Sequence, residues 1–318
     1  MKLYDILKCI VMKVFLSNIN ESWVVDRFRK DWYTHNPSIS TRFINLADII
    51  WIISPWLWKS LPNKHLTNKK VICSIYHIDF ENFDEKEEIE FKTRDQFVDL
   101  YHVISENTKN QLKNLTNKKI VSLPFWVDQN IFYFIEEKNK LRSKYNFLQD
   151  EYLIGSFQRD TEGSDLKSPK LIKGPDVFLE LVTKIYEKNN KTKIVLTGKR
   201  RNYLIDNLKK RNIPFKYFEM INQKSLNELY NILDLYLVTS RIEGGPQAVL
   251  ECGITKTPIL STNVGVAPEI LSRESLFKLE SFDSAKVDTD YAYKQSLKFV
   301  IPKGMLGYRE MFKLVYES

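Results

Sequence analysis

Two carboxylates, Glu243 and Glu251, stand close together in a stretch that has apolar runs on both sides. The run before them, residues 233–239, is predicted to be a buried strand, and Pro246 is typical of the first turn of a helix, where its missing N–H costs nothing. Two adjacent glycines in the loop between strand and helix let a ligand approach the backbone closely. A helix N-terminus attracts phosphate, whereas carboxylates accept hydrogen bonds from hydroxyl groups. The stretch therefore indicates a ligand with both a phosphate and a sugar, as in a nucleotide sugar.

The elements that must hold this stretch are predicted by the alternation of apolar runs with helical patterns. This alternation is typical of parallel sheets that carry helices on both faces. It falls into two blocks. Predicted strands lie near residues 12–16, 49–53, 71–76, 101–104 and 120–123 in the first block, and near 152–157, 193–197, 215–218, 235–238, 258–260 and 276–279 in the second.

Predicted helices and a connecting segment complete this outline. Residues 175–188 have a helical pattern, and Ser225 with Glu228 forms a capping box that predicts the start of another helix. The segment 130–149 is charged and has no strand pattern, so it is predicted to connect two domains.

Ligands of open parallel sheets bind beyond the carboxyl ends of the strands, so residues that leave predicted strands are candidates for function. In the first block they include His77, with Tyr76 and Asp79 beside it. In the second block they include Arg159 and the segment 241–245. Both blocks are expected to turn these residues toward a common cleft.

A family resemblance rests on the order of residues in the second half of the chain. Glu243 and Glu251 are followed by a Pro-containing strand at 257–262 and then by Gly265 and Glu269. This order resembles that of retaining GT-B glycosyltransferases of the family-four type.

Two cations extend the resemblance. Arg159, after the strand end at 155–157, and Lys173, before a glycine, match the Arg and Lys that bind the diphosphate in this family. The match is specific over about residues 150–272. The N-terminal half departs from the family, because residues 16–23 lack the usual Gly-rich turn and the domain is shorter than in most relatives.

The resemblance implies an α/β GT-B fold with two Rossmann-like doubly wound domains that face a cleft. Residues 1–140 would form the N-terminal domain on the acceptor side, and residues 141–302 would bind the nucleotide sugar. Residues 303–318 would form a terminal helix that crosses back to the first domain. The apolar side chains at helical spacing on this helix are Tyr308, Met311, Phe312 and Val315.

The resemblance also implies roles for single residues. Arg159 and Lys173 would stabilise the departing diphosphate, the guanidinium as a forked donor and the ammonium as a movable charge. Glu243 would accept hydroxyl groups of the donor sugar, and Glu251 those of the ribose. The remaining donor-binding residues would be Gly244, Gly245, Pro246, Val249 and Leu250.

Two positions carry open questions. Gly245 stands where the family usually has a bulky residue, so the choice of donor sugar is open. By resemblance His77 would be catalytic, in contact with the reacting sugar and the acceptor. The alternative is a core histidine with a structural role.

The function implied by the resemblance is that of a glycosyltransferase of the hexosyltransferase type. It would move a sugar from a nucleotide-sugar donor to a glycan, lipid-linked or small-molecule acceptor, with retention, while a donor phosphate oxygen takes the acceptor proton. No metal and no cofactor are expected. The triplet 288–290 resembles a metal-binding motif of another glycosyltransferase fold, but it lies outside a strand–loop context and is attributed to chance.

Two other functions stay open at this point. One is an epimerase or hydrolase that acts on nucleotide sugars with the same fold, and the other is a non-catalytic protein that binds nucleotide sugars or glycans. The base, sugar, acceptor, linkage and oligomeric state are not readable from the sequence.

Composition argues against other classes of function. The 318 residues carry a net charge of +8 that is spread over both halves, so nucleic-acid binding gains little support. The densest basic patch is attributed to a solvated helix face, with contact to anionic lipid headgroups as the alternative. Its residues are Lys199, Arg200, Arg201, Lys209, Lys210, Arg211 and Lys216.

Cysteine usage and hydropathy indicate the compartment. Cys9, Cys73 and Cys252 are widely spaced, which argues against a disulfide framework and for a reducing compartment. The N-terminus shows no secretory signal, and the apolar segment 43–58 is shorter than the roughly 20 residues that span a bilayer. Its tryptophans are assigned to a buried strand and the loop after it rather than to an interfacial anchor. We expect a cytoplasmic protein, with peripheral contact at the inner membrane face left open.

Overall fold

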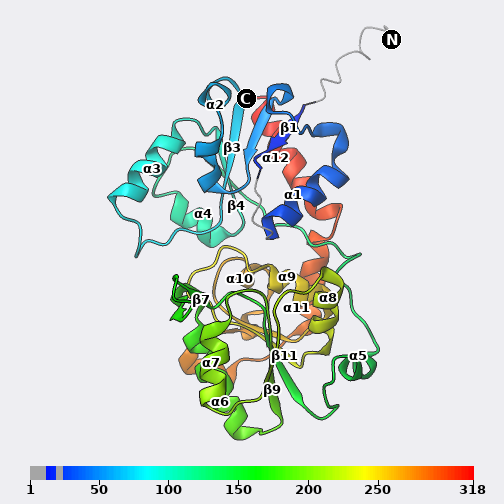
Figure 1. The fold of residues 1–318 in the computed structure, drawn as a ribbon. Coiled ribbons are helices and arrows are strands. Elements are labelled where there is room, and N and C mark those ends of the chain that lie inside the picture. Colours follow the sequence, from blue (N-terminus) through cyan, green and yellow to red (C-terminus); the bar gives the residue numbers. More distant parts are fainter. Residues whose placement is uncertain (1–11, 19–23) are drawn as a thin grey trace. The chain divides into compact units, whose positions relative to one another are not determined.

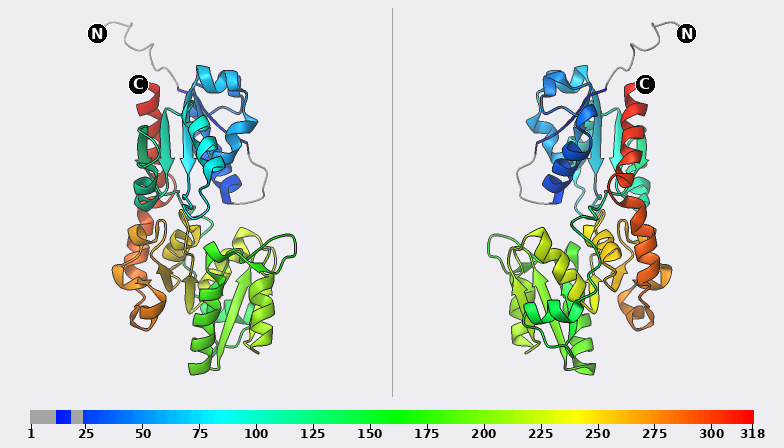
Figure 2. Two further views of the ribbon diagram at one scale, coloured as in Figure 1. Left: turned by 90° about the vertical axis from the view of Figure 1, so that its left-hand side faces the viewer. Right: turned by 90° about the vertical axis from the view of Figure 1, so that its right-hand side faces the viewer.

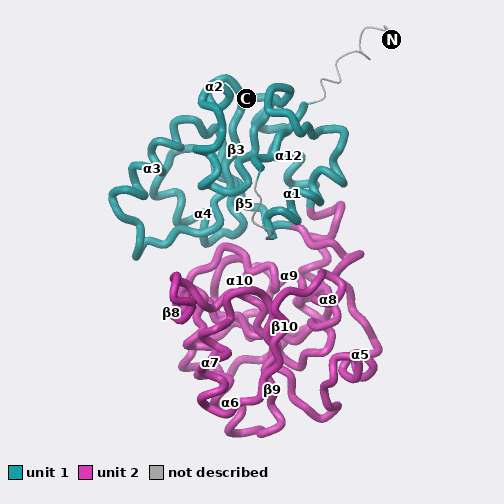
Figure 3. Tube along the Cα trace, viewed as in Figure 1, with its two compact units in different colours: residues 1–125, 305–318 teal, residues 126–304 magenta. Residues whose placement is uncertain are grey.

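The computed structural model describes residues 12–18 and 24–318, which form two compact units. Unit 1 consists of the described residues up to Phe125 together with Met305–Ser318, and unit 2 consists of Trp126–Gly304 (Figure 3). Each unit is built on its own parallel sheet. The interpretations of Cys9, of the N-terminus as lacking a secretory signal and of most of the segment without a Gly-rich turn concern residues outside the described ranges.

The segment 130–149, predicted to connect two domains, belongs to unit 2 and contains helix α5 (Lys138–Lys144). Arg142 of this helix is buried and pairs with Asp234 at 2.5 Å. Its guanidinium also donates to Ile232 O at 3.0 Å. At least one charged side chain of this segment therefore stabilises the interior of unit 2.

The sheet of unit 2 has the strand order β10-β9-β6-β11-β12-β13, with all neighbours parallel. The chain starts with β6, extends through β9 to β10 on one side, and then builds β11, β12 and β13 on the other side. The order thus reverses between β6 and β11, which is where ligands of such sheets bind. The strands are β6 (Tyr152–Ser156), β9 (Thr192–Thr197), β10 (Phe215–Phe218), β11 (Leu235–Val238), β12 (Ile259–Thr262) and β13 (Leu276–Phe277).

Helices cover both faces of this sheet (Figures 1 and 2). On one face, α6 and α7 bury Phe178 and Leu204 against strand residues such as Ile194. On the other face, α8 and α9 bury Leu229 and Val249. The helices are α6 (Pro175–Lys188), whose bounds agree with the prediction, α7 (Asn202–Lys210), α8 (Gln223–Ile232), α9 (Gln247–Thr255), α10 (Ala267–Ile270) and α11 (Thr289–Ser296).

Helix α8 begins before Ser225, so the predicted capping box is wrong. The N-cap is Asn222, whose side chain accepts a hydrogen bond from Ser225 N at 2.8 Å. Asn caps a helix as well as Ser does, and it occurs earlier in the chain. Glu228 instead accepts hydrogen bonds from the Tyr145 hydroxyl and the Lys144 ammonium, both at 2.5 Å.

The sheet of unit 1 has the sequential order β1-β2-β3-β4-β5, again parallel throughout. Among the described strands of this unit, the order therefore does not reverse. Each strand that the sequence predicts in either unit is present, with bounds that differ by at most two residues. The elements are β1 (Val14–Leu16), α1 (Val24–His35), β2 (Ile49–Ile52), α2 (Asn63–Asn68), β3 (Lys70–Ile75), α3 (Glu85–Asp95), β4 (Leu100–Val103), α4 (Glu106–Leu112) and β5 (Lys119–Ser122).

The terminal helix α12 (Leu306–Tyr316) packs into the core of unit 1. The four apolar side chains on its predicted face are each at most 3% exposed. The ring of Phe312 lies 5.1 Å from that of Trp32 and 5.4 Å from that of Trp51, and the ring of Tyr308 lies 5.4 Å from Trp51. The last residues of the chain thus complete the core of the unit formed by its first residues.

The tryptophans of the apolar segment 43–58 lie in a strand and the turn after it. Trp51 lies in β2 and is fully buried. Trp58 is buried and Trp56 is 43% exposed, both in the 3₁₀ helix η4 (Pro55–Ser60). Throughout the described part of the chain, no helix combines the length and apolar character needed to cross a membrane.

A chain of hydrogen bonds crosses the core of unit 1. Trp51 Nε1 donates to Ser74 Oγ at 2.8 Å, and Ser74 Oγ lies 2.8 Å from His102 Nδ1. His102 Nε2 lies 2.8 Å from Leu123 O, and a carbonyl oxygen only accepts, so Nε2 carries the proton and Nδ1 accepts from Ser74. Burial lowers the pKa of His102 to about 4, because a charged ring would be desolvated there.

Phe312→Ala should destabilise unit 1 by about 3–5 kcal/mol, since it removes a buried aromatic ring and leaves a cavity. Urea unfolding followed by tryptophan fluorescence measures the loss. The matched control is Leu314→Ala in the same helix, whose side chain is 39% exposed. Equal losses for the two variants would contradict the packing of α12.

The stability of unit 1 should rise with pH between about 4 and 6.5. The folded pKa of His102 lies below its ordinary value of 6.5, so the unfolded chain binds more protons in this window. The neutral His102 side chain should contribute about 3 kcal/mol to the free energy of unfolding above pH 7. This contribution should be lost as the pH falls to 4. Urea unfolding across this range measures it, and His102→Gln should flatten this part of the profile. An unchanged profile in the variant would exclude His102 as its source.

Candidate functional site

The candidate residues of unit 2 leave two neighbouring strands, β6 and β11, at the same edge of the sheet. Ile154 pairs with Leu235 in parallel register, so the segments after the two strands begin at adjacent points. Arg159 follows β6 and Glu243 follows β11. The reversal of strand order thus brings together residues that are far apart in the sequence.

Two glycines hold the loop after β11 by close backbone contact. Gly174 has a φ of 60°, and a Cβ placed on it would lie 1.8 Å from Thr239 O. Gly265 has a φ of 49°, and its Cβ would lie 2.2 Å from Gly244 O. A side chain at either glycine would displace the loop. Gly244 is buried between these contacts, and Gly245 is partly exposed.

Hydrogen bonds hold the same loop from the side of the segment before α6. Arg241 N and Ile242 N donate to Ile172 O at 2.9 and 3.1 Å. The Arg241 guanidinium donates to both carboxylate oxygens of Asp176, at 2.8 and 2.6 Å. This forked bond lowers the pKa of Asp176.

Lys173 and Glu243 form an ion pair with each other. Their side chains are 16% and 15% exposed, so the pair is largely shielded from water yet reaches the surface. Lys173 comes from the segment before α6 and Glu243 from the loop after β11, and both therefore reach the same point. An anion that approaches Lys173 therefore competes with Glu243 for the donors of the ammonium.

Gln158, which precedes Arg159, also leaves β6 at its carboxyl end, as the sequence predicts. Its Nε2 donates to Lys173 O at 2.9 Å, and its Oε1 accepts from Ser240 Oγ at 3.3 Å. One side chain thus joins the end of β6 to both segments that carry the ion pair.

A buried ion pair lies beside Arg159. Arg201 Nε donates to Asp160 Oδ2 at 2.6 Å, and the two side chains are 0% and 2% exposed. Arg201 Nη1 also donates to Ser156 O and Thr197 O, at the ends of β6 and β9. The prediction that Arg201 belongs to a solvated basic face is therefore wrong, because a run of charges does not reveal which side chain turns inward to a buried carboxylate.

Arg159 itself is exposed, and its Nε donates to Thr161 O at 2.9 Å. Thr161 belongs to a short antiparallel hairpin of β7 (Thr161–Glu162) and β8 (Ser168–Pro169). The guanidinium is thus held at the base of a hairpin next to the buried ion pair.

Helix α9 carries the last of the predicted donor-binding residues. Pro246 is its N-cap rather than a residue of its first turn. The side chains of Val249 and Leu250 are buried in the core, so only their backbone can face a ligand, and Val249 N already donates to Pro246 O at 2.9 Å. Glu251 is 4% exposed, and its Oε2 accepts a hydrogen bond from the Tyr230 hydroxyl at 2.8 Å.

His77 lies in unit 1, just beyond β3, and is half-buried. This is the carboxyl end of a strand, as predicted from the sequence. It is not among the residues that unit 2 brings together.

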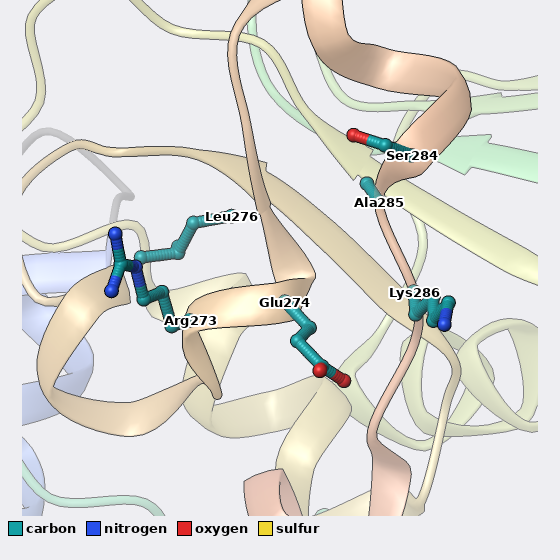
Figure 4. A pocket seen from close by; sticks show the side chains of 6 residues that line it. All are labelled: Arg273, Glu274, Leu276, Ser284, Ala285 and Lys286. Carbon is teal, nitrogen blue, oxygen red and sulfur yellow. The ribbon is translucent and has the colours of Figure 1, made fainter.

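Acidic clusters and cavities elsewhere in unit 2 do not add to this site. In the described ranges, no group of three or more His, Cys, Asp or Glu side chains is placed to hold a metal ion. In the triplet 288–290, Asp288 is the N-cap of α11 and accepts from Tyr291 N at 2.9 Å. A cavity of about 280 Å³ contains none of the candidate residues (Figure 4); it is lined by Arg273, Glu274, Leu276, Ser284, Ala285 and Lys286.

Comparison with known families gives a match within unit 2. A family model described as "Glycosyl transferases group 1" matches residues 168–283. This range contains Lys173, Glu243 and Glu251, and Arg159 precedes it. Among curated protein sequences, none matches the chain.

Solved structures share the fold over nearly the whole chain. Sucrose-phosphate synthase from Thermosynechococcus elongatus is similar with a TM-score of 0.69 and 12% identity, over 94% of this chain and 81% of that one. HepE from Anabaena, solved with UDP, has a TM-score of 0.74 and 11% identity, over 95% of this chain and 100% of that one. A glycosyltransferase from Rickettsia africae has a TM-score of 0.63 and 17% identity, over 95% and 84% of the two chains. At these identities the similarity establishes the fold.

Gly174→Ala should destabilise unit 2 more than Gly198→Ala does. Both glycines have positive φ, but a Cβ at Gly198 would meet only Phe157 O, at 3.7 Å. Gly198→Ala should therefore cost only backbone strain, about 1–2 kcal/mol. Gly174→Ala adds the overlap with Thr239 O. Thermal unfolding measures both losses, and equal values would contradict the close contact.

The fold and the family match agree with what the residues of the sequence implied. Both units are built on parallel sheets, and the matched family covers the loop and helix that carry Glu243 and Glu251. The expected GT-B fold and the resemblance to glycosyltransferases are thereby confirmed. The chain therefore has the fold of GT-B glycosyltransferases, and its residues 168–283 match the group 1 glycosyl transferase family.

Proposed function

We propose that unit 2 binds a UDP-sugar, with its diphosphate between Lys173 and the N-terminus of α9. The observation that carries this proposal is the Lys173–Glu243 pair at the point where the strand order reverses. An ammonium and a helix N-terminus both favour anions there. The choice of uridine rests on similar structures, since HepE from Anabaena was solved with UDP-glucose.

In this proposal, different side chains bind different parts of the donor. Arg159 and Lys173 neutralise the diphosphate, Glu243 accepts sugar hydroxyls once Lys173 turns to phosphate, and Glu251 accepts ribose hydroxyls. The backbone around Gly245 follows the diphosphate, because the absence of a side chain allows close approach. The other donor-binding positions are Gly244, Pro246, Val249 and Leu250.

The reaction is proposed to retain configuration at the anomeric carbon. The bond from that carbon to the diphosphate oxygen breaks, and a bond to the acceptor oxygen forms on the same face. The acceptor proton passes to a diphosphate oxygen of the donor, so no nucleophile from the protein is required. Arg159 and Lys173 stabilise the charge that grows on the leaving group, which is the task of a metal ion in other transferases.

The acceptor is proposed to be a glycan, a lipid-linked sugar or a small molecule, with His77 as a contact to the reacting groups. Similar structures include an O-GlcNAc transferase from pneumococcus, solved with UDP and GlcNAc. We place the reaction in the cytoplasm, with peripheral contact at the membrane as a further proposal.

The experiment that tests the function is incubation of a UDP-sugar with candidate acceptors, followed by mass spectrometry of the products. Donor that is epimerised or hydrolysed without an acceptor, or that stays intact with every acceptor, would favour the alternatives instead.

Lys173→Ala and Arg159→Ala should each lower kcat on the order of a hundredfold, because each removes a cation from the leaving group. Affinity for the uncharged nucleoside should change little. The matched control is Lys170→Ala, whose ammonium lies 3.6 Å from Glu162 in the same segment. Steady-state kinetics measure the effect, and a control as slow as the two variants would oppose these assignments.

Addition of EDTA should leave the transfer rate unchanged, since the proposed leaving-group stabilisation comes from side chains and helix amides. The rate is measured with and without the chelator, and again after a divalent ion is restored. A rate that is abolished by EDTA and rescued by Mg²⁺ or Mn²⁺ would replace this mechanism with a metal-assisted one.

A further inference from the structure

Tyr230 contacts Glu251 from within the core, and its ring is held on several sides. The residue is 2% exposed. Its ring lies 5.0 Å from that of Phe157, 5.6 Å from that of Tyr236 and 6.2 Å from that of Phe132. A ring packed among three others keeps one rotamer, so the place of its hydroxyl is determined.

Two threonines hold the backbones of the two residues. Thr257 Oγ1 donates to Tyr230 O at 2.9 Å, and Thr255 Oγ1 donates to Glu251 O at 2.8 Å. The two threonine hydroxyls lie 2.7 Å apart. Thr257 thus ties the backbone of Tyr230 in α8 to the segment just after α9, close to the hydrogen bond between Tyr230 and Glu251.

The direction of that hydrogen bond is set by the chemistry of its partners. A carboxylate oxygen accepts, so the Tyr230 hydroxyl donates to Glu251 Oε2. Burial, and then the negative charge of Glu251, raise the pKa of Tyr230 well above its ordinary value. The hydroxyl thus keeps its proton, and its bond to one oxygen limits rotation of the carboxylate.

We propose that Tyr230 is a positioning residue that orients the Glu251 carboxylate toward the ribose hydroxyls and so sets the preference for ribonucleotides over 2′-deoxyribonucleotides. This inference rests on the proposed function, in which Glu251 binds the ribose. A group that accepts hydrogen bonds from a ribose must point its oxygens at it, and a carboxylate free to rotate would lose part of that discrimination.

Tyr236 offers a matched control in the same aromatic cluster. It is as buried as Tyr230, and its hydroxyl accepts a hydrogen bond from Phe157 N at 3.0 Å. Tyr236→Phe therefore removes one buried hydroxyl while leaving the Tyr230–Glu251 bond in place. Any loss of nucleotide affinity that comes only from disturbing the aromatic cluster should occur in both variants.

The test is calorimetry with UDP, ADP, GDP and CDP, followed by the 2′-deoxy form of the tightest of these. Tyr230→Phe should weaken binding of the ribonucleotide about three- to tenfold and that of the deoxy form much less, so the ratio of the two affinities shrinks. Tyr236→Phe should leave the ratio unchanged. In a Glu251→Ala background, Tyr230→Phe should have no further effect on the ratio.

Each outcome decides one of the two claims. If no nucleoside diphosphate binds, or if Glu251→Ala leaves the affinity unchanged, the proposed function of the site fails. If Glu251→Ala weakens binding but Tyr230→Phe lowers both affinities alike, the positioning role is overturned while the site stands. Melting temperatures above the assay temperature establish that each variant is folded.

Discussion

The arrangement of the site depends on two places where a glycine backbone contacts the loop after β11. Gly174 lies against Thr239 and Gly265 against Gly244, at distances that leave no room for a Cβ. The loop is thereby fixed between the segment before α6 and the segment after β12. Because Lys173 precedes the first glycine directly, the same contact that fixes the loop also brings its ammonium to Glu243. Backbone packing thus sets the position of the charges, and the charges alone would not set the position of the backbone.

Charge in unit 2 is organised in two ways. Arg201 and Asp160 are fully buried and paired, and they tie the ends of β6 and β9 together, so they serve the scaffold. Lys173 and Glu243 are paired at a place that still reaches the surface, where a ligand can compete for either partner. Removing one member of a buried pair leaves an uncompensated charge, whereas exchanging a partner at the surface costs less. Two ion pairs of the same unit thus differ in burial, since one is enclosed in the scaffold and the other reaches the surface.

Unit 1 depends on the end of the chain. Phe312 and Tyr308 of α12 pack on Trp32 and Trp51, and the Tyr308 hydroxyl donates to Leu123 O beside the bond from His102. These contacts join residues separated by most of the sequence, so the core of unit 1 is completed only when the last helix is in place. This gives the terminal segment a role in stability even though it carries none of the candidate residues of unit 2.

The sequence by itself determined the strands, several of the helices and the place of the candidate loop, because hydrophobic periodicity, proline and glycine act over a few neighbouring residues. Only the tertiary structure decided the order of the strands and the partners of polar side chains. Nothing near Arg201 in the sequence indicates that it turns inward to Asp160, and nothing near Glu251 indicates Tyr230. The physical reason is that a polar side chain is satisfied by whichever group the fold brings within about 3 Å, and that group is set by packing between elements distant in the chain.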